Sequence, residues 1–256
     1  RRDLPVSLTM VVTTVLGVVG AASIALGTTP LLPTAALLGI CPLALRALPA
    51  RSLDVPEDVL IDISVAQRTA ASVREQPTPA PSRVRKESVT AAVHSAVTRR
   101  TWGAVVVSIL ALVTAGYLLI SVDSQMLART GFLDRVQSVS IPLVVLFVAV
   151  GFALIPRRER LGAARVGPRL VSGLLLVMLL SWGVAVGLMT SVIAIVIALV
   201  LVCSALGIAS PLSSGWRSVR WSRAADGVES LTAVLAPAMG LLAGGTLAYL
   251  RLLASG

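Results

Sequence analysis

The chain has 256 residues, of which 56% are hydrophobic and only 13% are charged, and its mean hydropathy is +0.91. Soluble domains average about 25% charged residues, so this composition excludes an ordinary soluble domain. Long uncharged stretches alternate with short arginine-rich ones, and the uncharged stretches have no polar face to turn toward water. We therefore predict an all-α fold, a polytopic bundle of membrane-spanning helices.

Seven stretches are long enough to cross a hydrocarbon core of about 30 Å, which takes about 20 helical residues. Helix is expected in each, because lipid offers no hydrogen-bond partner to the backbone. The predicted spans are Leu4–Gly27, Thr29–Leu48, Trp102–Val122, Val139–Pro156, Leu170–Met189, Thr190–Ser210 and Leu231–Leu250. The fifth and sixth spans meet at Thr190, which predicts a tight helical hairpin. The chain thus divides into residues 1–50 with two spans, a cytoplasmic segment at 51–100, and residues 101–256 with five spans.

The first residue is Arg1, not Met, so we expect the chain to be part of a longer protein. The apolar stretch Leu4–Gly27 is longer than the core of a signal peptide, and no small-residue cleavage site follows it. It is therefore expected to remain as a span.

The basic residues predict the orientation. Of the 22 Lys and Arg residues, 19 lie in segments on one side of the membrane, and only Arg129, Arg135 and Arg251 lie on the other. Because basic loops are retained in the cytoplasm, the N-terminus is expected inside and the C-terminus outside. The net charge of +10 then reflects topology and contact with anionic lipids. No recognition motif accompanies the arginines, so no nucleic-acid partner is expected.

The segment at 51–100 holds a predicted amphipathic helix over residues 54–76. Asp54 is a helix cap with Glu57 three positions later, and apolar residues recur at helical spacing. The candidate docking face consists of Val59, Ile63, Ala70 and Val73. Two interpretations stay open: the face packs on the protein's own helices or the membrane interface, or it binds a cytoplasmic partner. A proline-rich spacer follows, and a second helix is expected from Ser82 to Arg100, running into the third span.

The spans lack the residue types that membrane chemistry requires. Between their predicted ends they contain no Asp, Glu, Lys or His, and Arg46 near one end is the one arginine. Ion-coupled transporters and intramembrane hydrolases depend on such groups. Cys41, Cys203 and His94 are isolated and show no ligand spacing. We therefore predict no catalytic, cofactor or metal site, and no enzyme activity.

The spans are instead rich in small residues at close-packing intervals. Gly183 and Gly187 form one G-x-x-x-G pattern, and Gly240 and Gly244 form another. Such pairs let two helix backbones approach closely in lipid. We take these four glycines as candidate helix-packing positions.

Parts of the sequence resemble EccD-type membrane subunits of type VII (ESX) secretion systems. The residues that carry the resemblance are Leu31–Ala35, Pro42–Arg46, Leu53–Asp62, Ser210-Pro211, Trp216-Arg217 and Ala224–Glu229. Members of that family are expected to have eleven spans, and the seven predicted here would be spans five to eleven. The family's N-terminal ubiquitin-like domain and first four spans are missing from this sequence.

The resemblance implies a non-catalytic subunit of a bacterial protein-export complex that lines a vestibule in the plasma membrane. Its implied partners are a second copy of the chain, other membrane subunits and a motor ATPase. Two alternatives remain: an uncoupled multi-pass permease or facilitator, and a membrane anchor that recruits a partner protein.

Overall fold

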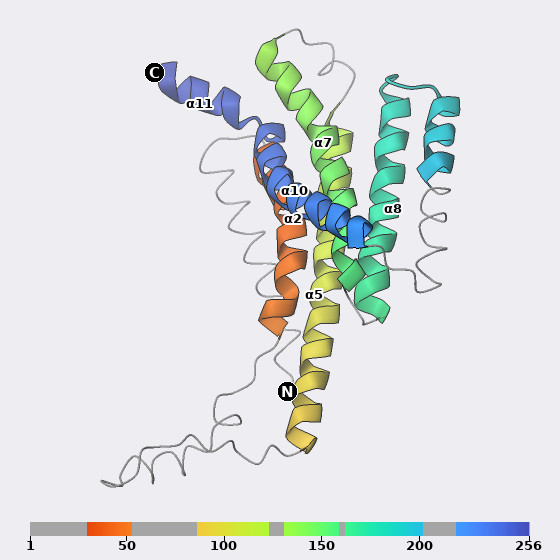
Figure 1. The fold of residues 1–256 in the computed structure, drawn as a ribbon. Coiled ribbons are helices and arrows are strands. Elements are labelled where there is room, and N and C mark those ends of the chain that lie inside the picture. The colour runs from red at the N-terminus through yellow and green to blue at the C-terminus, as the bar shows by residue number, and fades with distance from the viewer. Residues whose placement is uncertain (1–29, 53–85, 123–130, 159–161, 202–218, 256) are drawn as a thin grey trace. The chain divides into compact units, whose positions relative to one another are not determined.

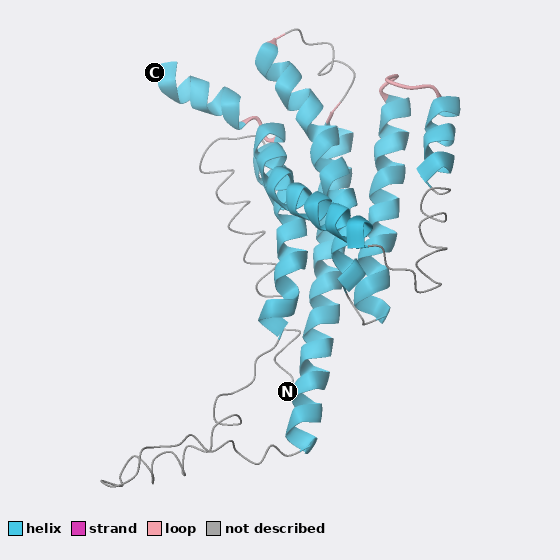
Figure 2. Ribbon diagram, viewed as in Figure 1, coloured by secondary structure: helices cyan, strands magenta, loops and turns pink. Residues whose placement is uncertain are grey.

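The computed structural model describes residues 30–52, 86–122, 131–158, 162–201 and 219–255. Within these ranges the secondary structure is entirely helical, without a strand (Figure 2). The chain divides into two compact units, one formed by Arg1–Arg46 with Ala104–Gly256 and the other by Ala47–Gly103. Each unit is described by itself, and the contacts between helices given below lie within the first.

The α-helices labelled in Figure 1 are α2 (Leu31–Ser52), α5 (Lys86–Ser121), α7 (Phe132–Leu154), α8 (Gly162–Ala185), α10 (Val219–Ala243) and α11 (Thr246–Ser255). Two described elements carry no label there: the 3₁₀ turn η1 (Ile155–Arg158), which follows α7, and a further helix, Ser191–Leu201.

Five of the helices are long and apolar enough to cross a membrane, which confirms the prediction of an all-helical membrane chain. These stretches are Leu31–Pro49, Thr90–Ser121, Phe132–Arg157, Ala164–Ala185 and Arg223–Ala243. The sixth predicted span is represented by the shorter apolar helix Ser191–Leu201. The first predicted span, Leu4–Gly27, lies outside the described residues, as does the predicted amphipathic helix over 54–76.

The predicted single helix over Leu231–Leu250 is wrong at both ends. Helix α10 begins at Val219 and stops at Ala243, and a separate helix, α11, begins at Thr246. The break lies at Gly245, whose φ of +79° is accessible to glycine and costly for other residues. Its N–H donates to the carbonyl of Leu242 at 3.0 Å, which closes the last turn of α10.

Helix α5 is one continuous helix of 36 residues, so the expected run of the preceding helix into the third span is confirmed. From Ala104 to Ala115, the buried side of α5 consists of small residues, and bulky aliphatic residues lie on the exposed side; further along, Leu118 and Leu119 are also buried. Ala104, Ser108, Ala111 and Ala115 are buried, whereas Val105, Ile109, Val113 and Ile120 are exposed. This arrangement is typical of a helix in lipid, where small residues favour helix contact and bulky aliphatic ones face the acyl chains.

A tight turn joins α8 to the helix Ser191–Leu201, at the position where a hairpin was predicted. Gly187 has a φ of +76°, and its N–H donates to the carbonyl of Val184 at 3.0 Å. Leu188 donates to the carbonyl of Gly183 at 2.9 Å, which completes a Schellman ending of α8. The turn therefore spans residues 186–190.

Glycines bring the backbones of α2 and α10 into close contact. A Cβ atom added at Gly39 would lie 2.6 Å from the carbonyl oxygen of Ala236. One added at Gly240 would lie 2.5 Å from the carbonyl oxygen of Ala35, and one at Gly244 would lie 2.6 Å from the Cα of Leu32. The two backbones thus touch directly, which only glycine allows at these positions.

Helix α7 packs against both α10 and α8, and Figure 1 shows α10 crossing it obliquely. Gly151 of α7 faces the ring of Pro42 of α2 and the hydroxyl of Thr232 of α10, so three helices meet at this glycine. On the side of α8, Ser172 Oγ donates to the carbonyl of Ala149 at 2.7 Å. The valine-rich face of α7 at this junction is fully buried, with Val144, Val145 and Val148 at its centre.

The α2–α10 contact yields a stability prediction. Gly240→Ala is expected to lower the free energy of unfolding by about 1–3 kcal/mol, because the added methyl group forces two backbones apart. The measurement is the unfolding of purified protein in mixed detergent micelles. Gly227→Ala in the same helix is the matched control, since nothing lies within 4 Å of its Cβ position. Equal stability of the two variants would contradict the backbone contact.

Candidate functional site

A group of charged side chains comes together where α7 ends and α10 begins. Pro156 follows the last α-helical turn of α7 and lies within η1, and Arg157 comes directly after it. A proline has no backbone N–H to continue an α-helix, so the chain tightens into the 3₁₀ turn here. Arg157 is thereby presented to α10 from the end of α7.

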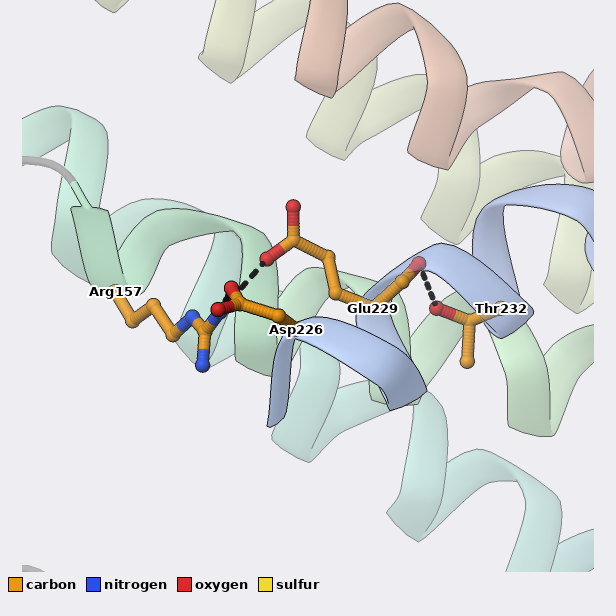
Figure 3. A network of polar contacts seen from close by, with 4 residues as sticks. All are labelled: Arg157, Asp226, Glu229 and Thr232. Atoms are coloured by element: carbon orange, nitrogen blue, oxygen red, sulfur yellow. Dashed lines mark hydrogen bonds and ion pairs between the residues drawn. The ribbon is translucent and has the colours of Figure 1, made fainter. Parts of the chain in front are cut away.

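Two acidic residues of α10 contact Arg157. Asp226 and Glu229 are three residues apart and so share one face of the helix. Arg157 Nη2 donates to Asp226 Oδ1 and lies 3.4 Å from Glu229 Oε2 (Figure 3). We call these three residues the α7–α10 ion cluster.

Burial differs sharply within the cluster. The side chain of Glu229 is 3% exposed, that of Arg157 is 20% exposed and that of Asp226 is 42% exposed. A carboxylate as buried as Glu229 is strongly destabilised unless a cation lies beside it. Arg157 supplies that charge, while Asp226 holds the guanidinium from the more exposed side. One turn further along α10, Thr232 Oγ1 donates to the carbonyl of Glu229 at 2.9 Å (Figure 3).

Two neutral side chains donate hydrogen bonds to carbonyls at helix ends, and the first of them joins the ends of α7 and α10 that lie away from the ion cluster. Gln137 Nε2, near the start of α7, donates to the carbonyl of Ala243 at the end of α10 at 3.3 Å. Trp182 Nε1, near the end of α8, donates to the carbonyl of Val122, just beyond α5, at 3.4 Å. The last carbonyls of a helix have no partner within the helix, so such donors are needed wherever water is absent.

The two sets of contacts show that α7 and α10 run antiparallel, and they also set a length. Twenty positions separate Gln137 from Arg157, which corresponds to about 30 Å of helix. Seventeen positions separate Asp226 from Ala243, which corresponds to about 26 Å. Both values are close to the hydrocarbon thickness of a bilayer, about 30 Å. The polar contacts therefore bracket one apolar layer of membrane thickness.

The candidate packing glycines fall into two different settings. Gly240 and Gly244 lie against the backbone of α2, as described above. A Cβ atom at Gly183 would meet the flexible side chain of Met189 in its own turn, 2.9 Å from Cε. Gly187 lies beyond the end of α8 and forms its C-terminal cap. The second pair therefore ends a helix, whereas the first pair contacts another helix.

The remaining candidate residues are dispersed. The predicted docking residues Val59, Ile63, Ala70 and Val73 lie outside the described residues, as does Cys203. Cys41 is buried in α2, where its Sγ donates to the carbonyl of Leu37 at 3.3 Å. His94 is exposed on α5, one turn from Thr98, whose hydroxyl donates to the carbonyl of His94 at 2.9 Å. Across the described ranges, no group of three or more His, Cys, Asp or Glu side chains forms a possible metal site.

The ion cluster corrects the prediction that the spans hold no acid between their ends. That prediction placed the start of the last span at Leu231, two residues beyond Glu229. The stretch of α10 that is long and apolar enough on average to cross a membrane begins earlier, at Arg223. Two acids at helical spacing, Asp226 and Glu229, immediately before an apolar stretch were the available signal. The arginine that joins them lies 69 residues from Asp226, and no local pattern links the two.

Comparison of the chain with family models, with curated proteins and with solved structures finds no match.

The cluster predicts how charge changes affect stability. Arg157→Gln is expected to lower the free energy of unfolding by about 3–5 kcal/mol, because it leaves the buried Glu229 without its neighbouring cation. The double variant Arg157→Gln with Glu229→Gln should regain most of that loss, since no buried charge remains. The free energies of unfolding of the single and the double variant are measured in mixed detergent micelles.

Arg165→Gln on an exposed position of α8 controls for the loss of an arginine and is expected to change stability little. If the double variant were as unstable as Arg157→Gln alone, the charge pairing would not be the cause.

Proposed function

We propose that this chain is a non-catalytic scaffold or conduit subunit of a bacterial protein-export complex, similar to the EccD-type subunits of type VII secretion. It would lie in the plasma membrane with a second copy of itself, other membrane subunits and a motor ATPase as partners. Protein export is proposed because three segments resemble that family, namely Leu31–Ala35, Pro42–Arg46 and Leu53–Asp62.

One structural observation carries the scaffold part of the proposal, namely how the helices use their small and polar residues. Glycines bring α2 and α10 into backbone contact, and the ion cluster ties α10 to α7. Large aliphatic side chains of α5, α8 and the helix Ser191–Leu201 meanwhile remain exposed in the single chain. A bundle held together internally, with a broad apolar perimeter, suits a subunit whose outer faces contact lipid and neighbouring subunits.

The alternative of an uncoupled permease needs a polar path along the helices. Buried hydroxyls are present on several helices, and in the described residues all of them except Ser108 Oγ donate to helix carbonyls. Thr114 donates to Leu110 at 2.7 Å, Ser140 to Val136, and Ser172 to Ala149. Hydroxyls used in this way serve helix bending and packing, which favours the scaffold over the permease. The membrane-anchor alternative assumes that the chain only recruits a partner protein. The test of the predicted docking face at 54–76 also tests this alternative.

The proposed topology has seven spans, a cytoplasmic N-terminus and an external C-terminus. Cysteines introduced at Ser82 and Ser214 are expected to resist a membrane-impermeant thiol reagent in intact cells, whereas one at Gln125 should react. The reason is the retention of basic segments in the cytoplasm. Cells opened by detergent provide the control, in which all three positions should label. Labelling of Ser82→Cys in intact cells would show that the orientation is the reverse of the one proposed.

The proposed contact with the motor ATPase uses the predicted docking face at 54–76. Val59→Asp with Ile63→Asp is expected to abolish co-purification of the ATPase while the chain stays inserted and stable, because each buried carboxylate would cost several kcal/mol at an apolar contact. Ser64→Asp with Ser72→Asp, on the opposite side of the predicted helix, should leave co-purification intact. Degradation of the first variant even in the absence of partners would instead favour packing within the chain.

A further inference from the structure

Helix α8 carries two exposed arginines on the side that faces away from α7. The other side of the helix is buried against α7, where Leu175 is fully buried and Ser172 donates to the carbonyl of Ala149. Arg165 and Arg169 are exposed. They are one helical turn apart, so their side chains are neighbours on the same face. The outer face of α8 therefore begins with two adjacent positive charges.

These two charges are not neutralised within the described part of the chain. The sequence of α8 from Gly162 to Ala185 contains no Asp or Glu. In the ranges that the structure describes, neither Arg165 nor Arg169 takes part in an ion pair. Like charges one turn apart destabilise a helix, so an anion placed between them is favourable. The pair thus calls for an anionic partner from outside the described bundle.

The depth of Arg169 indicates where that anion comes from. The apolar stretch of α8 that is long enough to cross a membrane begins at Ala164, five positions earlier. Beyond the arginine, Leu170, Leu174 and Val177 are 65%, 51% and 60% exposed on the outer side of the helix. Bulky aliphatic residues exposed on a span face acyl chains. An arginine beside them extends its guanidinium back to the headgroups, where the anions are lipid phosphates.

A glycine connects the charged and the apolar parts of this face. Gly173 is exposed, four positions after Arg169 and four before Val177, so the three share one stripe of the helix. Nothing lies within 4 Å of its Cβ position. The helix backbone is therefore open at this point, and an acyl chain that descends from a phosphate at the arginines can lie directly against it.

We propose that this face of α8 is a binding site for one anionic phospholipid. Its phosphate lies between Arg165 and Arg169, and an acyl chain follows Gly173, Leu174 and Val177. Two guanidinium groups match the oxygens of a phosphate by charge-assisted hydrogen bonds. A zwitterionic lipid brings its own cation to the same place, so it compensates the arginine pair less well than an anionic lipid does.

The net charge of +10 predicts only a general attraction to anionic lipids, whereas the proposal assigns them one site. It does not depend on the proposed export function; it requires only that α8 lies in a bilayer.

The experiment uses the full chain with Cys41→Ala and Cys203→Ala, reconstituted into bilayers with equal amounts of phosphatidylglycerol and phosphatidylcholine. Leu174→Cys carries a fluorophore. In one sample the phosphatidylglycerol has brominated acyl chains, which quench fluorescence on contact, and in the other the phosphatidylcholine has them. At equal mole fraction, brominated phosphatidylglycerol is expected to quench severalfold more strongly, because it occupies the site beside the label.

Two matched double variants test whether the arginine pair causes this preference. Arg165→Gln with Arg169→Gln is expected to make the two brominated lipids quench equally. Arg46→Gln with Arg223→Gln removes the same charge from exposed positions of α2 and α10 and should leave the preference intact. A label at Val113→Cys, which is exposed on α5, should be quenched equally by both lipids in every variant and reports that the chain is inserted.

Four results would overturn the proposal. Equal quenching by the two lipids at Leu174 with both arginines present would show no preference for anionic lipid. A preference that survives Arg165→Gln with Arg169→Gln would place its cause elsewhere. Equal loss in both double variants would show attraction to the overall surface charge. Quenching by neither lipid at Leu174, with normal quenching at Val113, would show that protein covers this face.

Discussion

Lipid provides no hydrogen-bond partners, and this single constraint explains most of the contacts between the helices. Inside a helix the backbone satisfies itself, so the unmet groups are concentrated at helix ends. The structure meets them there with Gln137 on the carbonyl of Ala243 and Trp182 on the carbonyl of Val122. The same constraint makes a buried charge tolerable only beside its opposite, as Glu229 is beside Arg157. Polar side chains therefore join helices mainly at their ends, and the layer between is filled by apolar packing together with the hydrogen bond from Ser172 to the carbonyl of Ala149.

Within that layer, the hydrophobic effect does not draw one helix to another, because acyl chains are as apolar as leucine. Close van der Waals contact takes its place, and contact is closest where no side chain intervenes. Gly39 on α2 and Gly240 on α10 meet in this way, with Gly151 of α7 facing Pro42 and Thr232 nearby. Three helices thus converge on glycines, and the ion cluster lies beside the same junction. Within the described residues, one helix, α10, thus carries both the backbone contact with α2 and the buried carboxylate of Glu229.

The sequence was sufficient to predict features that depend on composition alone. Apolar stretches predicted the helices, and the meeting of two stretches at Thr190 predicted the hairpin that Gly187 makes possible. Helix ends were less predictable, because hydropathy does not register a single residue with positive φ such as Gly245 or a helix that begins in charged residues such as α10. The pairing of Arg157 with Asp226 and Glu229 was not predictable, since it depends on which helices become neighbours. For Gly240 and Gly244 the sequence indicated a packing surface, but it could not name α2 as the helix they contact.

The 69 residues between Arg157 and Asp226 have a consequence for biosynthesis. A ribosome completes α7 well before it makes α10, so Asp226 and Glu229 do not yet exist when Arg157 reaches the membrane. Gly39 of α2 likewise waits for Gly240, which is made 201 residues later in the printed sequence. The early helices can insert one by one, but their mutual arrangement is completed only when α10 enters between them. Helix α10 is thus made after the helices that it joins, and a chain truncated before Val219 would lack every contact that α2 and α7 make with it.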